Sequence, residues 1–166
     1  MPILLHFCEW LYQTRFSTSI RESVWVFPII ESIHVLSITV LVGTIAVFDL
    51  RLLGALMKRE PVSVIARQVL PWTWAGFAVM FGSGLLLFIA EAGTNYYNLA
   101  FRIKLALLFL VGLNPLIFHT SVFRKVADWD LAEAIPLRAR VAAVVSLTLW
   151  AGIIVAGRMI AYLERP

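Results

Sequence analysis

The apolar positions of this chain form four long blocks, and polar residues gather in the short stretches between them. Each block contains about 20 residues, the length that an α-helix needs to cross the hydrocarbon core of a bilayer. We place the predicted membrane-spanning helices at residues 26–48, 69–91, 101–123 and 140–161. Short connections make successive helices antiparallel. The pattern therefore predicts an all-α membrane protein, an antiparallel bundle of four transmembrane helices that forms a single domain over residues 1–166.

A shorter apolar pattern precedes the first block. Leu4, Cys8, Leu11 and Tyr12 recur at helical spacing, which predicts a helix over about residues 3–20 that lies in the membrane interface. The segment lacks the basic start and the small-residue cleavage site of a signal peptide. The single cysteine, Cys8, excludes an intramolecular disulfide. We expect this thiol to serve as a small buried hydrophobic group.

The composition supports a membrane location. Hydrophobic residues make up 61% of the chain, charged residues 14%, and the mean hydropathy is +0.88. Ordinary soluble domains are only about half apolar. The net charge of +4 comes without a basic stripe and interleaved aromatic residues, so it gives no indication of nucleic-acid binding.

The positive charges instead predict an orientation. Lysine and arginine are enriched in cytoplasmic loops. The first and third loops hold Arg51, Lys58, Arg59, Arg67, Arg124, Lys125, Arg138 and Arg140. We therefore expect a multi-pass protein of the bacterial inner membrane with both termini in the periplasm.

Ionisable residues inside the apolar blocks are the candidates for function, because such groups are costly in lipid and usually face the bundle interior. The stretch "IIESIHVLS" sets Glu31 three residues before His34 at the start of the first span. At the same predicted depth, near the outer surface, lie Glu91, Arg102, Lys104 and Arg158; near the cytoplasmic surface lie Asp49, Arg51, His119 and Arg124. The outer set draws acids, bases and a histidine from all four spans, so we expect it to converge on one site.

Heme b is the first hypothesis for that site. A membrane heme needs an imidazole as axial ligand and basic groups near its propionates. His34 would be the ligand, Glu31 would orient it or relay protons, and Gly82 and Gly84 would either admit the porphyrin or let helices pack closely. Arg102, Lys104 and Arg158 would pair with the propionates. His119 lies too far from the depth of His34 to complete the ligand set. The open alternatives are His6 as the second ligand, a non-histidine ligand, or a five-coordinate heme.

Two further hypotheses use the same residues. A copper-handling or small transport protein would bind its metal through Glu31, His34 and Glu91, with His119 as another candidate metal ligand. Alternatively, the chain is a structural accessory subunit whose polar groups lock helices together or dock a partner. A quinone headgroup bonded to His34 is compatible with the heme hypothesis. The expected partners are the lipid bilayer and either a redox protein or further copies of the chain.

The whole chain also resembles an uncharacterised family of small bacterial four-span membrane proteins. The stretches "SIHVLSITVLVGTIAVFDLRLLG" and "FRIKLALLFLVGLNPLIFH" are distantly similar to HemJ-like protoporphyrinogen oxidases and to CopD-like copper-resistance membrane proteins. His34, Arg51 and Lys104 occupy matching places in that comparison. The resemblance implies heme ligation for His34 and a charge role for Lys104. Because "VGTIAVFDLR" departs from the HemJ-like pattern before the arginine, no enzyme activity is implied.

Overall fold

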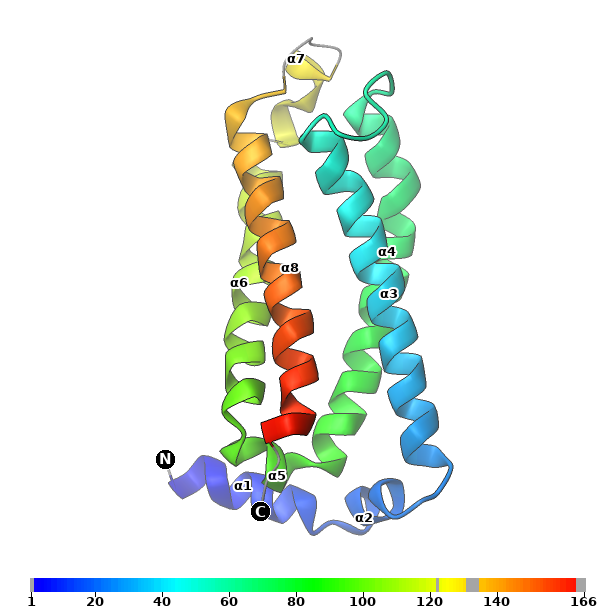
Figure 1. Ribbon diagram of the computed structural model, residues 1–166, viewed down its shortest axis with the longest axis vertical. Helices are drawn as coiled ribbons and strands as arrows, with labels where there is room; N and C mark the ends of the chain where they lie inside the picture. Colours follow the sequence, from blue (N-terminus) through cyan, green and yellow to red (C-terminus); the bar gives the residue numbers. More distant parts are fainter. Residues whose placement is uncertain (1, 122, 131–134, 164–166) are drawn as a thin grey trace.

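Four long helices run antiparallel to one another in the computed structural model, which describes residues 2–121, 123–130 and 135–163 (Figure 1). The described elements are α1 (Pro2–Tyr12), α2 (Arg15–Arg21), α3 (Val26–Leu52), α4 (Val62–Ala90), α5 (Ala92–Tyr97), α6 (Leu99–Ser121), the 3-10 helix η1 (Phe123–Lys125), α7 (Val126–Trp129) and α8 (Leu137–Leu163). Helices α3, α4, α6 and α8 are all long and apolar enough to cross a membrane. The prediction of an all-α protein with four spans is confirmed.

The long helices extend beyond the apolar blocks that predicted them. Helix α4 begins at Val62 rather than at residue 69, and α8 begins at Leu137 rather than at residue 140. Each starts directly after a proline, Pro61 or Pro136, which is suited to a helix start because its ring fixes φ and it has no N–H to satisfy. Hydrophobicity marks where a helix meets lipid, whereas the backbone hydrogen bonds that define its ends continue into the polar region.

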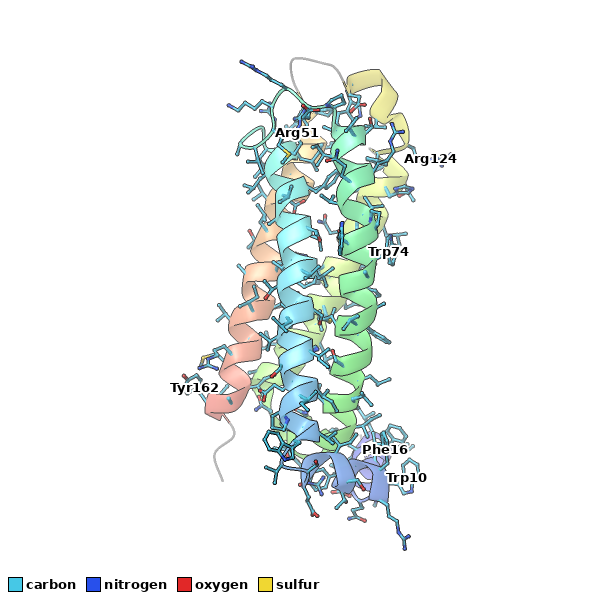
Figure 2. The ribbon with its side chains drawn as sticks, turned by 90° about the vertical axis from the view of Figure 1, so that its right-hand side faces the viewer. Trp10, Phe16, Arg51, Trp74, Arg124 and Tyr162 are labelled. Atoms are coloured by element: carbon cyan, nitrogen blue, oxygen red, sulfur yellow. The ribbon has the colours of Figure 1, made fainter. Side chains whose placement is uncertain are left out.

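The predicted interfacial helix is two helices. Thr14 separates α1 from α2, and its hydroxyl oxygen caps α2 by accepting a hydrogen bond from the Ser17 N–H at 3.2 Å. Large apolar side chains on both helices are exposed, including Trp10 and Phe16, which Figure 2 shows at the end of the bundle. Their exposure agrees with a location in the membrane interface. Cys8 is buried at 3% exposure, and burial raises the pKa of its thiol, as a packing role would require.

The two ends of the bundle are built differently. We call the end that carries α1, α2, α5 and the last turn of α8 the termini end, and the end that carries η1, α7 and the connection from α3 to α4 the loop end (Figure 1). At the termini end, α2 covers the last carbonyls of α4. The Ser17 hydroxyl donates to the Ile89 carbonyl at 2.9 Å, and the Arg21 guanidinium donates to the Ala90 carbonyl at 3.0 Å. These bonds satisfy backbone groups that the end of any helix leaves free.

The four spans pack as two pairs. Helix α3 lies along α4, and α6 lies along α8; the backbones of the two pairs approach each other mainly where α3 contacts α8. Side chains also join α4 to α6, since the rings of Phe88 and Phe101 are stacked with 5.7 Å between their centroids. Gly76 permits the close approach of α4 to α3, since a Cβ there would lie 3.1 Å from the Leu41 backbone nitrogen. The centre of the bundle is apolar, formed by Leu41, Met80, Val111, Trp150 and Ile153. Polar groups are therefore confined to the two halves on either side of this cluster.

Candidate functional site

His34 is the buried histidine of the bundle, with 8% of its surface exposed. Its Nδ1 lies 3.1 Å from the Met80 carbonyl oxygen and 3.0 Å from Ser83 Oγ, so α4 holds the ring at two points. The hydroxyl proton of Ser83 is directed to the Val79 carbonyl, 2.6 Å away. Both neighbours of Nδ1 can then only accept, and we assign the neutral ring as the tautomer with its proton on Nδ1. Nε2 keeps its lone pair and makes no hydrogen bond to the described residues, whose contacts to this ring are both at Nδ1.

Gly84 makes this position of the ring possible. A Cβ at residue 84 would lie 2.9 Å from Cε1 of His34, a distance at which one of the two groups must move. Gly82, two residues earlier on the same helix, has nothing within 4 Å of such a Cβ. Of the two glycines in "FGSGLL", only Gly84 therefore shapes the surroundings of His34. The serine between them, Ser83, supplies a polar contact to the ring that the sequence analysis did not assign.

Lys104 brings a positive charge to the same half of the bundle. It lies near the start of α6 and is half-buried. Its ammonium end approaches α8, where Nζ lies 3.8 Å from the position of a Cβ on Gly157. All four spans thus contribute to the surroundings of one histidine and one lysine.

The other predicted site residues lie elsewhere. Glu31, Arg102 and Arg158 are exposed, and the Arg158 guanidinium lies 5.6 Å from the Tyr162 ring centroid. Glu91 ends α4, half-buried, and accepts a hydrogen bond from the Thr94 hydroxyl at 3.1 Å. The structure does not gather these four side chains around His34.

The predicted metal cluster is not formed. Over the described ranges 2–121, 123–130 and 135–163, no three His, Cys, Asp or Glu side chains come close enough to hold a metal ion. Glu31 points away from the interior that buries His34, although the two residues are less than one turn apart. His119 is exposed and stacks on Phe123, with 5.5 Å between ring centroids. Glu31, His34 and Glu91 are therefore not gathered as a set of metal ligands among the described residues, and His119 joins no such group.

His6 is also remote from the candidate site. It lies on the exposed surface of α1, where its Nδ1 is 3.9 Å from the carboxylate of Glu9. Because His119 lies at the far end of α6, the structure leaves His34 as the one histidine of this chain inside the bundle.

A second group of polar residues occupies the loop end. Asp49 on α3 is buried at 5% exposure; Ser146 of α8 lies beside its carboxyl group, but Oδ2 has no hydrogen-bond partner among the described residues. Arg51 is buried too, and its guanidinium donates from Nε and Nη2 to the Glu60 carbonyl at 2.8 and 2.6 Å (Figure 2). The arginine therefore holds the connection between α3 and α4.

Asp130 ties the segment after α7 to the start of α4. Its carboxylate accepts hydrogen bonds from the Ser63 N–H, at 2.9 Å, and from the Ser63 hydroxyl. Burial alone would raise the pKa of Asp130, but the bonds from Ser63 and Val62 and the charge of Arg51 outweigh it and hold this pKa below its usual value. A carboxylate at a helix N-terminus also complements the helix dipole. The sequence analysis missed this contact, because it joins residues 67 positions apart.

Comparison with known proteins gives one match. Residues 7–163, nearly the whole chain, match a protein family described as a family of unknown function, DUF6644. No curated protein and no solved structure matches the chain.

Proposed function

The chain belongs to DUF6644, a family of unknown function, and from that premise we propose that it is a membrane protein that binds heme b through Nε2 of His34 and takes part in electron transfer. The observation that carries the proposal is the state of the imidazole. Nδ1 is held by the Met80 carbonyl and by Ser83, and the described residues make no hydrogen bond to Nε2.

This arrangement is the one that metal-ligating histidines use. Such a histidine donates its second ring N–H to a carbonyl or another acceptor, which fixes both the tautomer and the orientation of the ring. Here the Met80 carbonyl and the Ser83 oxygen accept that bond. A histidine with only a packing role gains as much from a bond at either nitrogen, so the choice of Nδ1 favours ligation by Nε2.

The cofactor's electrostatics also fit. Heme carries two propionates, and a basic group near them offsets the cost of placing negative charge in a membrane. Lys104 is half-buried, with its ammonium group beside Gly157 of α8, so it is the first candidate to pair with a propionate. Arg102 and Arg158 are exposed and stay candidates for this role. The bound heme would supply one-electron redox chemistry, with a quinone or a redox protein as electron partner.

The ligand count makes the proposal specific. Because His6 and His119 are exposed and remote, His34 would be the one histidine ligand that this chain supplies. The proposal therefore predicts a heme with a single histidine ligand from each chain, and not the pair of histidines that clamps a heme from both faces.

Purified protein tests the proposal directly. The chain should be produced in cells supplied with a heme precursor, extracted in mild detergent, and examined by reduced-minus-oxidised absorption spectroscopy and by pyridine hemochrome assay. We expect Soret and α bands in the parent protein, and their loss in His34→Gly. Added imidazole should restore the bands in that variant, because it can occupy the space that the side chain leaves.

The matched control is His119→Gly, which removes an exposed histidine from the same chain. It should keep the full spectrum. A parent protein that stays colourless under heme supply, or bands that survive His34→Gly without imidazole, would overturn the proposal. A colourless parent protein in which His34→Gly lowers only the melting temperature would instead support the role of a structural subunit.

A further inference from the structure

An apolar groove opens on the lipid-facing side of the loop end. Its volume is about 460 Å³, and it lies between α4 and the segment formed by η1 and α7. Its walls are almost entirely apolar, and they are formed mainly by Ala66, Leu70, Pro71, Trp74, Phe123 and Val126. Leu70, Pro71 and Trp74 are exposed, so the groove faces outward and does not belong to the buried interior.

Positive charge lies at the mouth of this groove. Arg67 lines it one turn before Pro71, is exposed, and makes a single long hydrogen bond of 3.5 Å from Nε to the Ser63 carbonyl. Arg124 follows the groove residue Phe123 and is exposed as well. Figure 2 shows Trp74 and Arg124 on the same side of the bundle, with Arg124 nearer the loop end. Ser63 lines the same end and is bonded to the Asp130 carboxylate, so two arginines and one acid lie at the loop end of the groove. The rest of the groove is apolar.

We propose that this groove binds an anionic phospholipid, with an acyl chain along α4 and the phosphate against Arg67 and Arg124. The charge complementarity identifies the occupant. A basic site beside membrane helices favours anionic lipid headgroups, and the seven residues from Arg67 to Trp74 span about 10 Å of helix, enough for several methylene groups.

Other occupants fit less well. The acyl chain of a zwitterionic lipid could occupy the apolar groove, but its headgroup would bring no net negative charge to the two arginines. A soluble phosphate would meet only exposed side chains that water already solvates, and it would leave the apolar walls empty. The lipid site uses both parts of the groove. It is remote from His34 and does not depend on heme binding.

Lipid binding can be measured with the full chain in nanodiscs. The nanodiscs should contain phosphatidylcholine mixed with either brominated phosphatidylglycerol or brominated phosphatidylcholine. Quenching of tryptophan fluorescence by the bromine atoms then reports which lipid lies near each tryptophan. The component that Trp74→Phe removes reports on the groove, since Trp74 lines it. We expect that component to show preferential binding of phosphatidylglycerol by about five- to tenfold, in line with about one lysine or arginine contact to an anionic surface.

The variant Arg67→Gln should reduce this preference to about twofold or less, while Arg59→Gln, an exposed arginine at the same end outside the groove, should leave it unchanged. Circular dichroism should show both variants folded, since both side chains are exposed. Equal quenching by the two lipids, or equal loss in the two variants, would overturn the proposal. Displacement by inorganic phosphate at millimolar concentration would overturn it also, because the site would then hold a free ion.

Discussion

His34 and Asp49 lie on the same helix and the same buried stripe, yet they differ in how far their polar atoms are hydrogen-bonded. The imidazole of His34 has two partners on α4, and a glycine makes room for it. The carboxyl group of Asp49 is even less exposed, but its Oδ2 has no partner among the described residues. The His34 ring is therefore oriented by its neighbours, whereas the Asp49 carboxyl group, which has Ser146 beside it, keeps one buried oxygen without a partner among the described residues.

This difference distinguishes a polar residue that can bind a ligand from one that only lowers the stability of a membrane helix bundle. A group that is oriented with one atom left free is prepared to bind a ligand at that atom. A carboxyl group enclosed without a partner instead lowers the stability of the fold, since burying an unpaired polar atom is costly. Substitutions at and near these two groups should therefore differ in the size and the sign of their effects.

Gly84→Ala should displace the His34 ring. The new Cβ would lie 2.9 Å from Cε1, so we expect overpacking to lower the free energy of unfolding by about 1–3 kcal/mol and to weaken heme binding. Detergent-unfolding curves and heme titration measure the two effects. Gly82→Ala is the matched control, because nothing lies within 4 Å there, and it should be neutral or slightly stabilising. Equal effects of the two substitutions would show that the ring is not held against α4.

Asp130→Asn should weaken the loop end, where an acid does have partners. Loss of charge from the group that caps α4 should lower the free energy of unfolding by about 1–2 kcal/mol. Because the folded pKa of Asp130 lies below its usual 3.8, its stabilising contribution is complete above that pH and is lost as the pH falls through the folded pKa. Melting temperatures should therefore converge for parent and variant in strong acid. A constant difference at every pH would refute the capping role.

Asp49→Asn should have the opposite sign. The amide keeps the shape of the side chain and cannot ionise, so it removes the cost of enclosing a negative charge, and we expect the free energy of unfolding to rise by about 1 kcal/mol. The same chemical change at Asp130 is the control. If Asp49→Asn destabilised the protein as much as Asp130→Asn does, then the carboxylate would have a partner or a ligand that stabilises its charge.

Ser83→Ala should give the smallest effect. It removes one of the two acceptors at Nδ1 and leaves the Met80 carbonyl, so the free energy of unfolding should fall by about 0.5–1 kcal/mol. The heme spectrum should persist with a small shift of the Soret band. Complete loss of heme would instead show that Ser83, and not the backbone carbonyl, sets the orientation of the ring.

Much of this fold follows from local pattern. The four apolar blocks predict the four spans because an α-helix satisfies its own backbone within lipid, and no distant residue is needed for that result. His34 could also be chosen from the sequence, since it lies inside an apolar block where an ionisable group has a cost. The helix ends were less predictable, as α4 shows, because its start depends on Pro61 and on Asp130 from another segment.

Side-chain neighbours were decided by the tertiary structure alone. Glu31 and Asp49 share an azimuth on α3, but only Asp49 is covered, because a stripe on a helix is buried only where other helices pack on it. In the same way, the sequence showed two glycines near a serine, but only the packing of α3 on α4 decided that Gly84 faces the ring and Gly82 does not. The sequence by itself determined which residues lie in the membrane; how the helix pairs pack decided which of those residues meet.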